Sequence, residues 1–176
     1  NYLIQIFDQK MNFIKQFGGK GSSRNRFDLP VSANVFNQIL FICDKNNDRV
    51  LFYEEDSIFF KTLIKRKFQE GILSRPSSLA FAGNNLLVSD RSNNVVQVFN
   101  KKLEFIRLLQ FPDKIKRPAS ITVFDSNELF YVYILERREF GLPILRLFKF
   151  DKNLQNCKPC NQFKLNSVLG DPQDMD

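Results

Sequence analysis

The chain has 176 residues, including 20 phenylalanines but no histidine or tryptophan, and its formal net charge is +7. The lack of histidine excludes Ser-His-Asp and Cys-His catalytic arrangements, and histidine metal ligands, within these residues. No apolar run approaches the ~20 residues that cross a membrane as a helix, so we predict no membrane insertion.

Several classes of residue recur along the chain at a constant step of 46. Asn1, Asn47 and Asn93 keep this step (47 − 1 and 93 − 47), and so do Asp44 and Asp90. A period in the mid-forties that contains short apolar runs predicts a four-stranded unit, repeated as the blade of a β-propeller. Three further sets share the register: Phe7, Tyr53 and Phe99; Phe13, Phe59 and Phe105; Pro30 and Pro76.

The predicted elements follow this period in chain order. Residues 1–7 are a cut-off copy of the strand at 93–99, and residues 13–18 are an outer strand with a glycine turn. Turns rich in Asp, Asn, Gly and Ser separate the strands, and no segment keeps a helical period. We therefore predict an all-β protein. The second unit has strands at 35–36, 40–42, 49–53 and 58–64, and the third has strands at 78–81, 86–88, 95–99 and 103–109.

The fourth unit departs from the others. It has Val132 where the aspartate that closes the second strand would fall. It also carries extra residues around Arg137 to Pro143 before residues 145–151 resume the pattern. We predict that the extra residues form a protruding loop or an extended hairpin.

One motif joins a turn to the third strand of each unit. It reads Asn-Asp-Arg-Val-Leu-Phe-Tyr at 47–53, Asn-Asn-Val-Val-Gln-Val-Phe at 93–99 and Asn-Tyr-Leu-Ile-Gln-Ile-Phe at 1–7. The motif resembles the Asn-x-Arg-Ile-Gln-x-Phe pattern of NHL-repeat β-propellers, although Leu3 and Val95 replace the arginine and Leu51 replaces the glutamine. The resemblance covers about residues 1–135. It implies an incomplete part of a six-bladed NHL-type propeller, while related families of six to eight blades stay open.

The units divide the chain into blades. We predict a partial first blade at 1–18, blades at about 30–64, 76–110 and 118–156, and a tail or the start of a further blade at 157–176. Propellers close with four to eight blades, whereas these segments make about three and a half. We therefore predict that the remaining blades come from the same polypeptide or from another chain.

Two groups of residues suggest a possible chemistry. Cys157 and Cys160 have the spacing of a redox dithiol or of half a zinc site, but only Cys43 remains as a further thiol and no βαβ context surrounds them. Three interpretations of these two cysteines stay open: an incidental pair, which we favour, then a disulfide, and last a metal site. Asp44 and Asp90 could be catalytic carboxylates, but their identical place at successive strand ends predicts turn capping. We expect no cofactor, no metal and no catalysis by this segment.

Basic residues concentrate in the connections that lead from an outer strand to the next inner strand. In a propeller these connections lie on one face of the disc, so the net charge predicts an electropositive face that attracts an anionic partner. The alternative is that the charges only solvate exposed loops. The predicted partner-binding residues are Lys20, Arg24, Arg26, Lys65, Arg66, Lys67, Arg75, Lys114, Lys116 and Arg117.

We favour a non-catalytic interaction or scaffold module that presents these loops to partner proteins in a larger assembly. The alternative is RNA binding by the same face, which the resemblance to NHL proteins implies for some members. RNA readers combine basic residues with exposed aromatics, for which Phe27, Phe68 and Phe111 are candidates unless they belong to the core. An enzyme with its chemistry outside this segment is a third possibility. The sparse, odd set of cysteines favours an intracellular, cytoplasmic protein.

Overall fold

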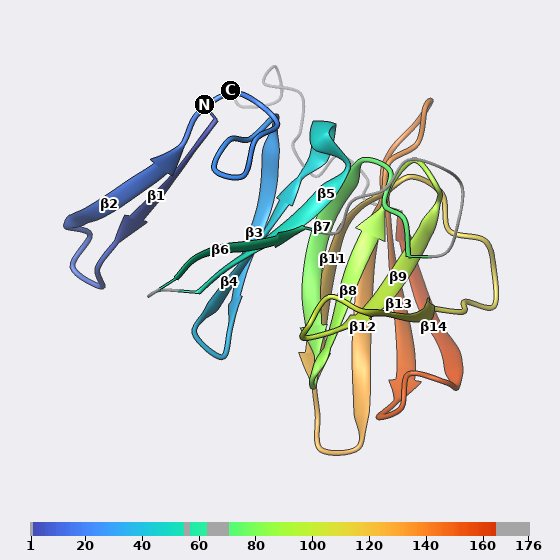
Figure 1. Cartoon of the computed structure of the whole chain (residues 1–176). Helices are drawn as coiled ribbons and strands as arrows, with labels where there is room; N and C mark the ends of the chain where they lie inside the picture. Colours follow the sequence, from blue (N-terminus) through green and yellow to red (C-terminus); the bar gives the residue numbers. More distant parts are fainter. Residues whose placement is uncertain (1, 55–56, 63–70, 165–176) are drawn as a thin grey trace, which may run out of the picture.

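The computed structural model describes residues 2–54, 57–62 and 71–164, and these ranges fold almost entirely into β-strands (Figure 1). Their one helical element is a 3-10 turn, Lys45–Asn47 (η1). None of the described residues forms a helix long and apolar enough to cross a membrane. The all-β prediction is confirmed.

One two-stranded and three four-stranded antiparallel sheets make up the fold, and in each sheet the strands are neighbours in chain order. This arrangement is the predicted blade. The sheets are β1 (Leu3–Phe7) and β2 (Phe13–Gly18); β3 (Pro30–Phe36), β4 (Ile39–Asp44), β5 (Arg49–Glu54) and β6 (Ser57–Thr62); β7 (Pro76–Ala82), β8 (Asn85–Asp90), β9 (Val95–Asn100) and β10 (Phe105–Leu108); β11 (Pro118–Asp125), β12 (Leu129–Glu136), β13 (Ile144–Asp151) and β14 (Cys157–Lys164).

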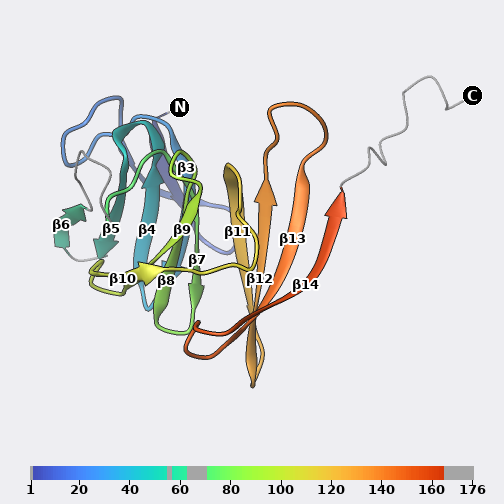
Figure 2. The ribbon, with the colours of Figure 1, turned by 90° about the vertical axis from the view of Figure 1, so that its right-hand side faces the viewer.

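The four-stranded sheets pack side by side through their first strands (Figures 1 and 2). β7 contacts both β3 and β11, and nearly all of its residues are buried. First strands that gather in this way line the axis of a propeller, while the fourth strands lie on the outside. The structure is therefore an arc of a β-propeller.

The core consists of three apolar clusters, each between two successive sheets. Phe99 is fully buried in the cluster between the second and third blades. In the same cluster, the Phe81 ring stacks on Phe36 at a centroid distance of 4.3 Å and meets Phe41 edge-on at 5.0 Å. The phenylalanines at strand positions thus supply the packing between blades.

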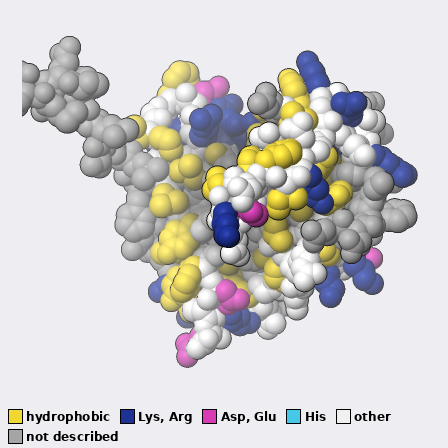
Figure 3. Space-filling model, turned by 90° about the vertical axis from the view of Figure 1, so that its left-hand side faces the viewer, with side chains coloured by type: hydrophobic (Ala, Val, Ile, Leu, Met, Phe, Trp, Pro, Cys, Tyr) yellow, Lys and Arg dark blue, Asp and Glu magenta, His cyan; other side chains and the backbone are white. Residues whose placement is uncertain are grey.

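Several large apolar side chains on the first, second and fourth sheets are exposed. Val35 on β3 is 65% exposed, and Phe13 and Ile14 on β2 are 55% and 56% exposed. Figure 3 shows hydrophobic side chains over much of this side of the molecule. On the fourth blade, Phe124 is 61% exposed. Strand alternation therefore places apolar residues on both faces of these sheets, as it does in the covered blade.

The last blade corrects one predicted boundary. β14 pairs with β13 and supplies the fourth strand of this blade, so the prediction of a tail or the start of a further blade is wrong for residues 157–164. Pro159 and a register shift opposite Leu147 and Phe148 interrupt the strand pattern, and both are tolerated because β14 is an edge strand. Residues 137–143 form the predicted protruding loop between β12 and β13 (Figure 2).

Candidate functional site

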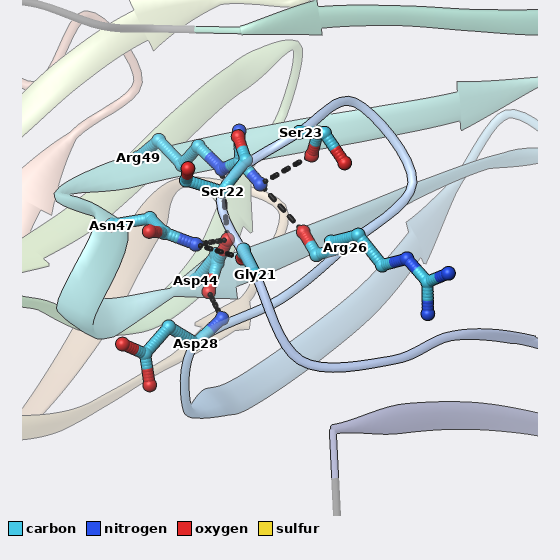
Figure 4. Close-up of polar contacts among 8 residues, drawn as sticks. All are labelled: Gly21, Ser22, Ser23, Arg26, Asp28, Asp44, Asn47 and Arg49. Carbon is cyan, nitrogen blue, oxygen red and sulfur yellow. Dashed lines mark hydrogen bonds and ion pairs between the residues drawn. The ribbon is translucent and has the colours of Figure 1, made fainter.

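An acidic residue closes the second strand of each four-stranded blade, and in the second and third blades it accepts hydrogen bonds from two loops. Asp44, fully buried at the end of β4, accepts the backbone N–H of Asp28 at 2.7 Å on Oδ1. Its Oδ2 accepts the side-chain amide of Asn47 at 2.7 Å (Figure 4). Asp44 thus joins the turn after β4 to the connection that arrives from the preceding blade, in agreement with the turn-capping interpretation.

We call the buried acid, with the side chains and loop groups that bond to it, the anchor of the blade. Arg49, at the start of β5, belongs to the anchor of the second blade. Its Nε donates to Asp44 Oδ2 at 2.8 Å, and its side chain is 4% exposed. The two terminal nitrogens donate to backbone carbonyls of the connection between β2 and β3, at 2.8 Å to Ser22, 3.1 Å to Ser23 and 2.6 Å to Arg26 (Figure 4). A buried ion pair therefore holds this loop in place.

The third blade builds the same anchor without a cation. Gln97 donates its amide to Asp90 Oδ2 at 2.8 Å and to the Ile72 carbonyl at 2.7 Å, and its oxygen accepts the N–H of Gly71 at 3.0 Å. Burial raises the pKa of the Asp90 carboxyl, although hydrogen bonds from Asn93, Gln97 and the Ser74 backbone oppose the shift. Neutral hydrogen bonds hold the incoming connection here.

The fourth blade uses a glutamate at this place. Glu136 pairs with Pro118 as Asp44 pairs with Pro30, so the assignment of Val132 to this position is wrong. Val132 is a fully buried core residue in the middle of β12. The repeat itself carries the correct signal, because Glu136 follows Asp90 by one step of 46 (136 − 90).

Arg146 on β13 completes the fourth anchor. Its Nη1 donates to Glu136 Oε1 at 3.0 Å and to the Lys114 carbonyl at 3.1 Å, and its Nη2 donates to Asp113 Oδ2 at 3.1 Å. Glu136 and Arg146 are 6% and 5% exposed. The connection between β10 and β11 is thereby held over the end of the blade.

Five basic residues border these anchors. Three of them directly follow the acidic residue, again at steps of 46, and two directly precede the proline that begins β7 or β11. Each acid lies opposite such a proline in the ladder, so all five residues lie at the same end of the blades. We call them the basic cluster: Lys45, Arg75, Arg91, Arg117 and Arg137.

Hydrogen bonds from the neighbouring blade fix two of these residues. The backbone N–H of Arg75 donates to Asp48 Oδ1 at 2.7 Å, and that of Arg117 donates to Asn94 Oδ1 at 2.7 Å. Both arginines have left-handed backbones, with φ of 53° and 45°. A side-chain acceptor at the same place in two successive turns thus orients the residue before each inner strand.

The cluster brings like charges close together. Burial lowers the pKa of Lys45, and the charges of Arg91, Arg75 and Arg137 lower it further. Burial also lowers the pKa of Arg91, with Arg137, Arg75 and Arg117 adding to the effect. Within the described ranges, ion pairs reach only Arg117 of the five, from Glu139 at 3.6 Å. The cluster therefore has excess positive charge.

Two adjacent pockets open at this end of the blades. The smaller, of about 400 Å³, is lined by Arg75, Arg91, Ser92, Asn94 and Arg117. The larger, of about 660 Å³, has a mixed lining that includes Arg137, Arg138 and Phe140 together with three acidic residues, Asp113, Glu136 and Glu139. Phe140, on the loop between β12 and β13, is 89% exposed. Basic and aromatic groups are thus both available to a partner.

The structure brings together only part of the predicted binding set. Arg75 and Arg117 share the smaller pocket, and Lys114 and Lys116 line the larger one with Arg117. Lys20, Arg24 and Arg26 are exposed on the loop that Arg49 holds, where Arg26 donates to the Gly18 carbonyl and Lys20 lies over the Tyr2 ring. Lys65, Arg66 and Lys67 lie outside the described residues.

The two candidate base-stacking aromatics that the structure describes belong to the core instead. Phe27 is fully buried, and Phe111 packs on Phe148 and Phe150 at the edge of the core. Phe68 lies outside the described residues. Phe140 is the exposed aromatic beside the basic cluster, and the inserted position of its loop was the available signal.

Sequence reasoning also missed Lys45, Arg91 and Arg137, because it considered only the connections between blades. The 46-residue step marks these three residues directly. The described part of the chain contains no group of three or more His, Cys, Asp or Glu side chains placed to hold a metal ion. The chemistry of the site is that of a cationic surface.

No protein-family model matches the chain. Protein brain tumor of Drosophila melanogaster is 28% identical over 158 residues, which cover 85% of this chain and 14% of that protein. The chain therefore spans about one seventh of its curated relative.

Solved structures share the fold at low identity. A chain of a nidogen/laminin complex matches with a TM-score of 0.57 at 13% identity over 76% of this chain and 48% of its own length. Virginiamycin B lyase from Staphylococcus aureus matches with a TM-score of 0.55 at 13% identity over 91% and 64%. A functionally unknown protein from Desulfotomaculum acetoxidans matches with a TM-score of 0.58 at 17% identity over 93% and 49%. The four-stranded antiparallel blades and these propeller-like neighbours give the chain the fold of a β-propeller.

Proposed function

We propose that this chain is a non-catalytic interaction module, part of an NHL-type β-propeller, which binds an acidic surface of a partner protein through the basic cluster. The observation that carries this proposal is the excess of positive charge at one end of the blades. Lys114 and Lys116 extend the cluster on one side. Such a surface attracts an anionic partner and speeds its association.

The construction of the blades supports a binding role for these charges. Like charges held together reduce the stability of the folded chain, and here the residues next to them are fixed by buried anchors and side-chain acceptors. A partner that carries acidic groups would relieve the repulsion. The similarity to Protein brain tumor supports the NHL type. The buried free thiol of Cys43 is consistent with an intracellular, cytoplasmic setting.

The test reverses charge at the two ends of the blades. In the full-length protein, the pair Arg75→Glu and Arg91→Glu is compared with the pair Lys101→Glu and Lys102→Glu, which lies in the turn between β9 and β10 at the opposite end. Binding to immobilised poly-L-glutamate is measured at low salt. We expect the first pair to weaken binding by at least about tenfold and the second by less than about twofold. Equal effects of the two pairs, with unchanged thermal melting, would contradict the proposal.

RNA is the second candidate partner, because Phe140 is exposed beside Arg137 and Arg138. Bases stack on exposed aromatics, and phosphates pair with neighbouring cations. Binding of a single-stranded RNA is measured at several salt concentrations, with Phe140→Ala as the variant. An RNA partner predicts a log–log slope of about 0.7 per phosphate contact and a weaker Phe140→Ala variant. RNA binding tighter than that of polyglutamate would favour this function over the first.

A further inference from the structure

The smaller pocket differs from its surroundings in having no acidic residue in its lining. Arg75, Arg91 and Arg117 line it from three different connections, β6–β7, β8–β9 and β10–β11, and Ser92 and Asn94 supply polar groups. The adjacent larger pocket contains Asp113, Glu136 and Glu139, two of which pair with Arg146. Glu139 pairs with Arg117 at 3.6 Å, but among the described residues no ion pair reaches Arg75 or Arg91, so the smaller pocket presents two guanidinium groups without a carboxylate partner.

Short-range contacts hold the walls of this pocket. The backbones of Arg75 and Arg117 are fixed by Asp48 and Asn94, as described above. The N–H of Ser92 donates to the Ser74 carbonyl at 3.1 Å, which ties the turn that carries Arg91 to the residue before Arg75. The three arginine side chains therefore start from backbone positions that are already in place, so that less conformational entropy is lost when a ligand binds.

We propose that this pocket binds a phosphomonoester, carried by a phosphorylated side chain of the partner protein. The inference rests on the proposed function and names the group that the basic cluster recognises. Guanidinium groups form paired hydrogen bonds with phosphate oxygens. Clusters of arginine are a common means of recognising phosphorylated peptides.

The number of charges selects a phosphate over a carboxylate. A phosphorylated side chain carries a charge of about −1.5 to −2 at neutral pH and three acceptor oxygens, so it can serve more than one guanidinium at once. A carboxylate neutralises a single arginine and leaves the others unpaired. Burial lowers the pKa of Arg91, and the nearby charges of Arg137, Arg75 and Arg117 lower it further. The closeness of these positive charges supports a ligand with more than one negative charge.

The surroundings of the pocket are mixed in charge, because the adjacent larger pocket carries acidic residues beside Lys114 and Lys116. Asp113 and Glu139 border the adjacent pocket, and the side chains of both are 67% exposed. An RNA backbone that leaves the smaller pocket on this side would pass these carboxylates. A single phosphate group does not meet that repulsion.

The test uses fluorescent heptapeptides with capped ends and Gly and Ser flanks. Their central residue is phosphoserine, serine or glutamate, and they bind the full-length protein at about pH 7.5 and low salt. We expect the phosphopeptide to bind at least about tenfold more tightly than the glutamate peptide. Arg91→Gln and Arg117→Gln should each weaken it about tenfold. Lys101→Gln, at the opposite end of the blades, should leave it within about twofold.

A pH series provides a second readout. The second pKa of a phosphorylated side chain is about 6, so lowering the pH from about 7.5 to about 5 should weaken phosphopeptide binding several-fold while the arginines stay charged. A phosphopeptide affinity that does not change with pH would count against a phosphate-binding pocket. So would equal affinity for the glutamate peptide, or no change with Arg91→Gln in a protein that melts normally.

The outcomes separate this inference from the proposed function. If polyglutamate binding depends on Arg75 and Arg91 but phosphoserine and glutamate peptides bind alike, the acidic-partner proposal stands and the phosphate pocket is overturned. If neither ligand depends on the basic cluster, both fail. Tighter binding of a seven-nucleotide RNA, lost in Arg91→Gln, would replace the phosphopeptide with RNA.

Discussion

In the second blade, Asp44 is paired with the guanidinium of Arg49, whereas in the third blade Asp90 meets the neutral amide of Gln97. Arg49 lies directly opposite the acid in the ladder, while Gln97 lies two residues further along its strand, opposite Val88. The two blades share topology and register but differ in the donor that compensates the buried carboxylate. The blade therefore requires that the acid be satisfied and the incoming loop be held, and it accepts more than one donor position.

The fourth blade extends this comparison. Arg146 lies opposite Ile134, which corresponds to Val88 at one step of 46, so it occupies the place of Gln97 while carrying the charge of Arg49. Glu136 accepts a hydrogen bond from this cation at 3.0 Å. The donor thus changes in every blade, whereas the acid changes only in the fourth.

Removal of the cation from the second blade should have the largest effect. Arg49→Ala is expected to lower the free energy of unfolding by about 3–5 kcal/mol, because Asp44 then stays buried as an uncompensated charge. Three carbonyls of the incoming loop also lose their donor. Urea denaturation of the full-length protein measures the change. A loss below about 1 kcal/mol would show that the ion pair does not stabilise the blade.

Phe99 in the third blade and Tyr53 in the second hold the same place in the third strand but differ in burial. Phe99→Ala should cost about 3–5 kcal/mol, since Phe99 is fully buried between blades. Tyr53 holds the same place in the second blade but is half-buried against Phe17, at a ring distance of 5.0 Å, so Tyr53→Ala should cost less. Lys101→Ala is the exposed control, for which a change within about 0.5 kcal/mol is expected. Equal losses of unfolding free energy in Phe99→Ala and Tyr53→Ala would show that the two blades are covered to the same extent.

Truncation of the neutral donor should cost less than truncation of the cation. Gln97→Ala is expected to lower the free energy of unfolding by about 1–3 kcal/mol, because Gly71 N–H, the Ile72 carbonyl and Asp90 each lose a partner but no buried cation is removed. Measurement beside Arg49→Ala under the same conditions gives the comparison directly. A larger loss for Gln97 than for Arg49 would reverse the order proposed here.

The pH dependence of stability should distinguish the third blade further. The folded-state pKa of Asp90 is raised by burial, so the folded protein keeps this proton at pH values where the unfolded chain has lost it. Its contribution is therefore fully present below the unfolded pKa and is lost as the pH rises through the folded pKa. The stability of the natural protein relative to Asp90→Asn should fall as the pH rises from about 4 towards 7. A relative stability that rises over this range would contradict the raised pKa.

Relief of repulsion in the basic cluster should have the smallest effect. Arg91→Gln is expected to raise the free energy of unfolding by less than about 1 kcal/mol at low salt, because Arg91 lies near Arg75, Arg117 and Arg137 and is only partly buried. The gain should shrink at high salt, where surface charges are screened. Destabilisation by Arg91→Gln that is independent of salt would indicate a packing role instead.

The periodic and local features of this chain were accessible from its sequence. The 46-residue step, the strand order and the turn positions follow from short apolar runs and turn residues, since antiparallel neighbours in a blade are also neighbours along the chain. The same step also relates Glu136 to Asp90, and Lys45 to Arg91 and Arg137, although these relations were overlooked in the sequence analysis. The strand at 157–164 was missed because Pro159 breaks the pattern on an edge where the ladder tolerates it.

Tertiary structure alone decided which side chains meet. Arg49, Gln97 and Arg146 occupy two different strand positions, and only the packing of the incoming loops shows that all three complete the same type of anchor. The pocket of Arg75, Arg91 and Arg117 likewise depends on connections from different blades, and it is lined by arginines 16 to 42 positions apart (91 − 75 and 117 − 75). Charges on separate loops gather because the blades fan around one axis, and strand patterns carry no information about the distance between such loops.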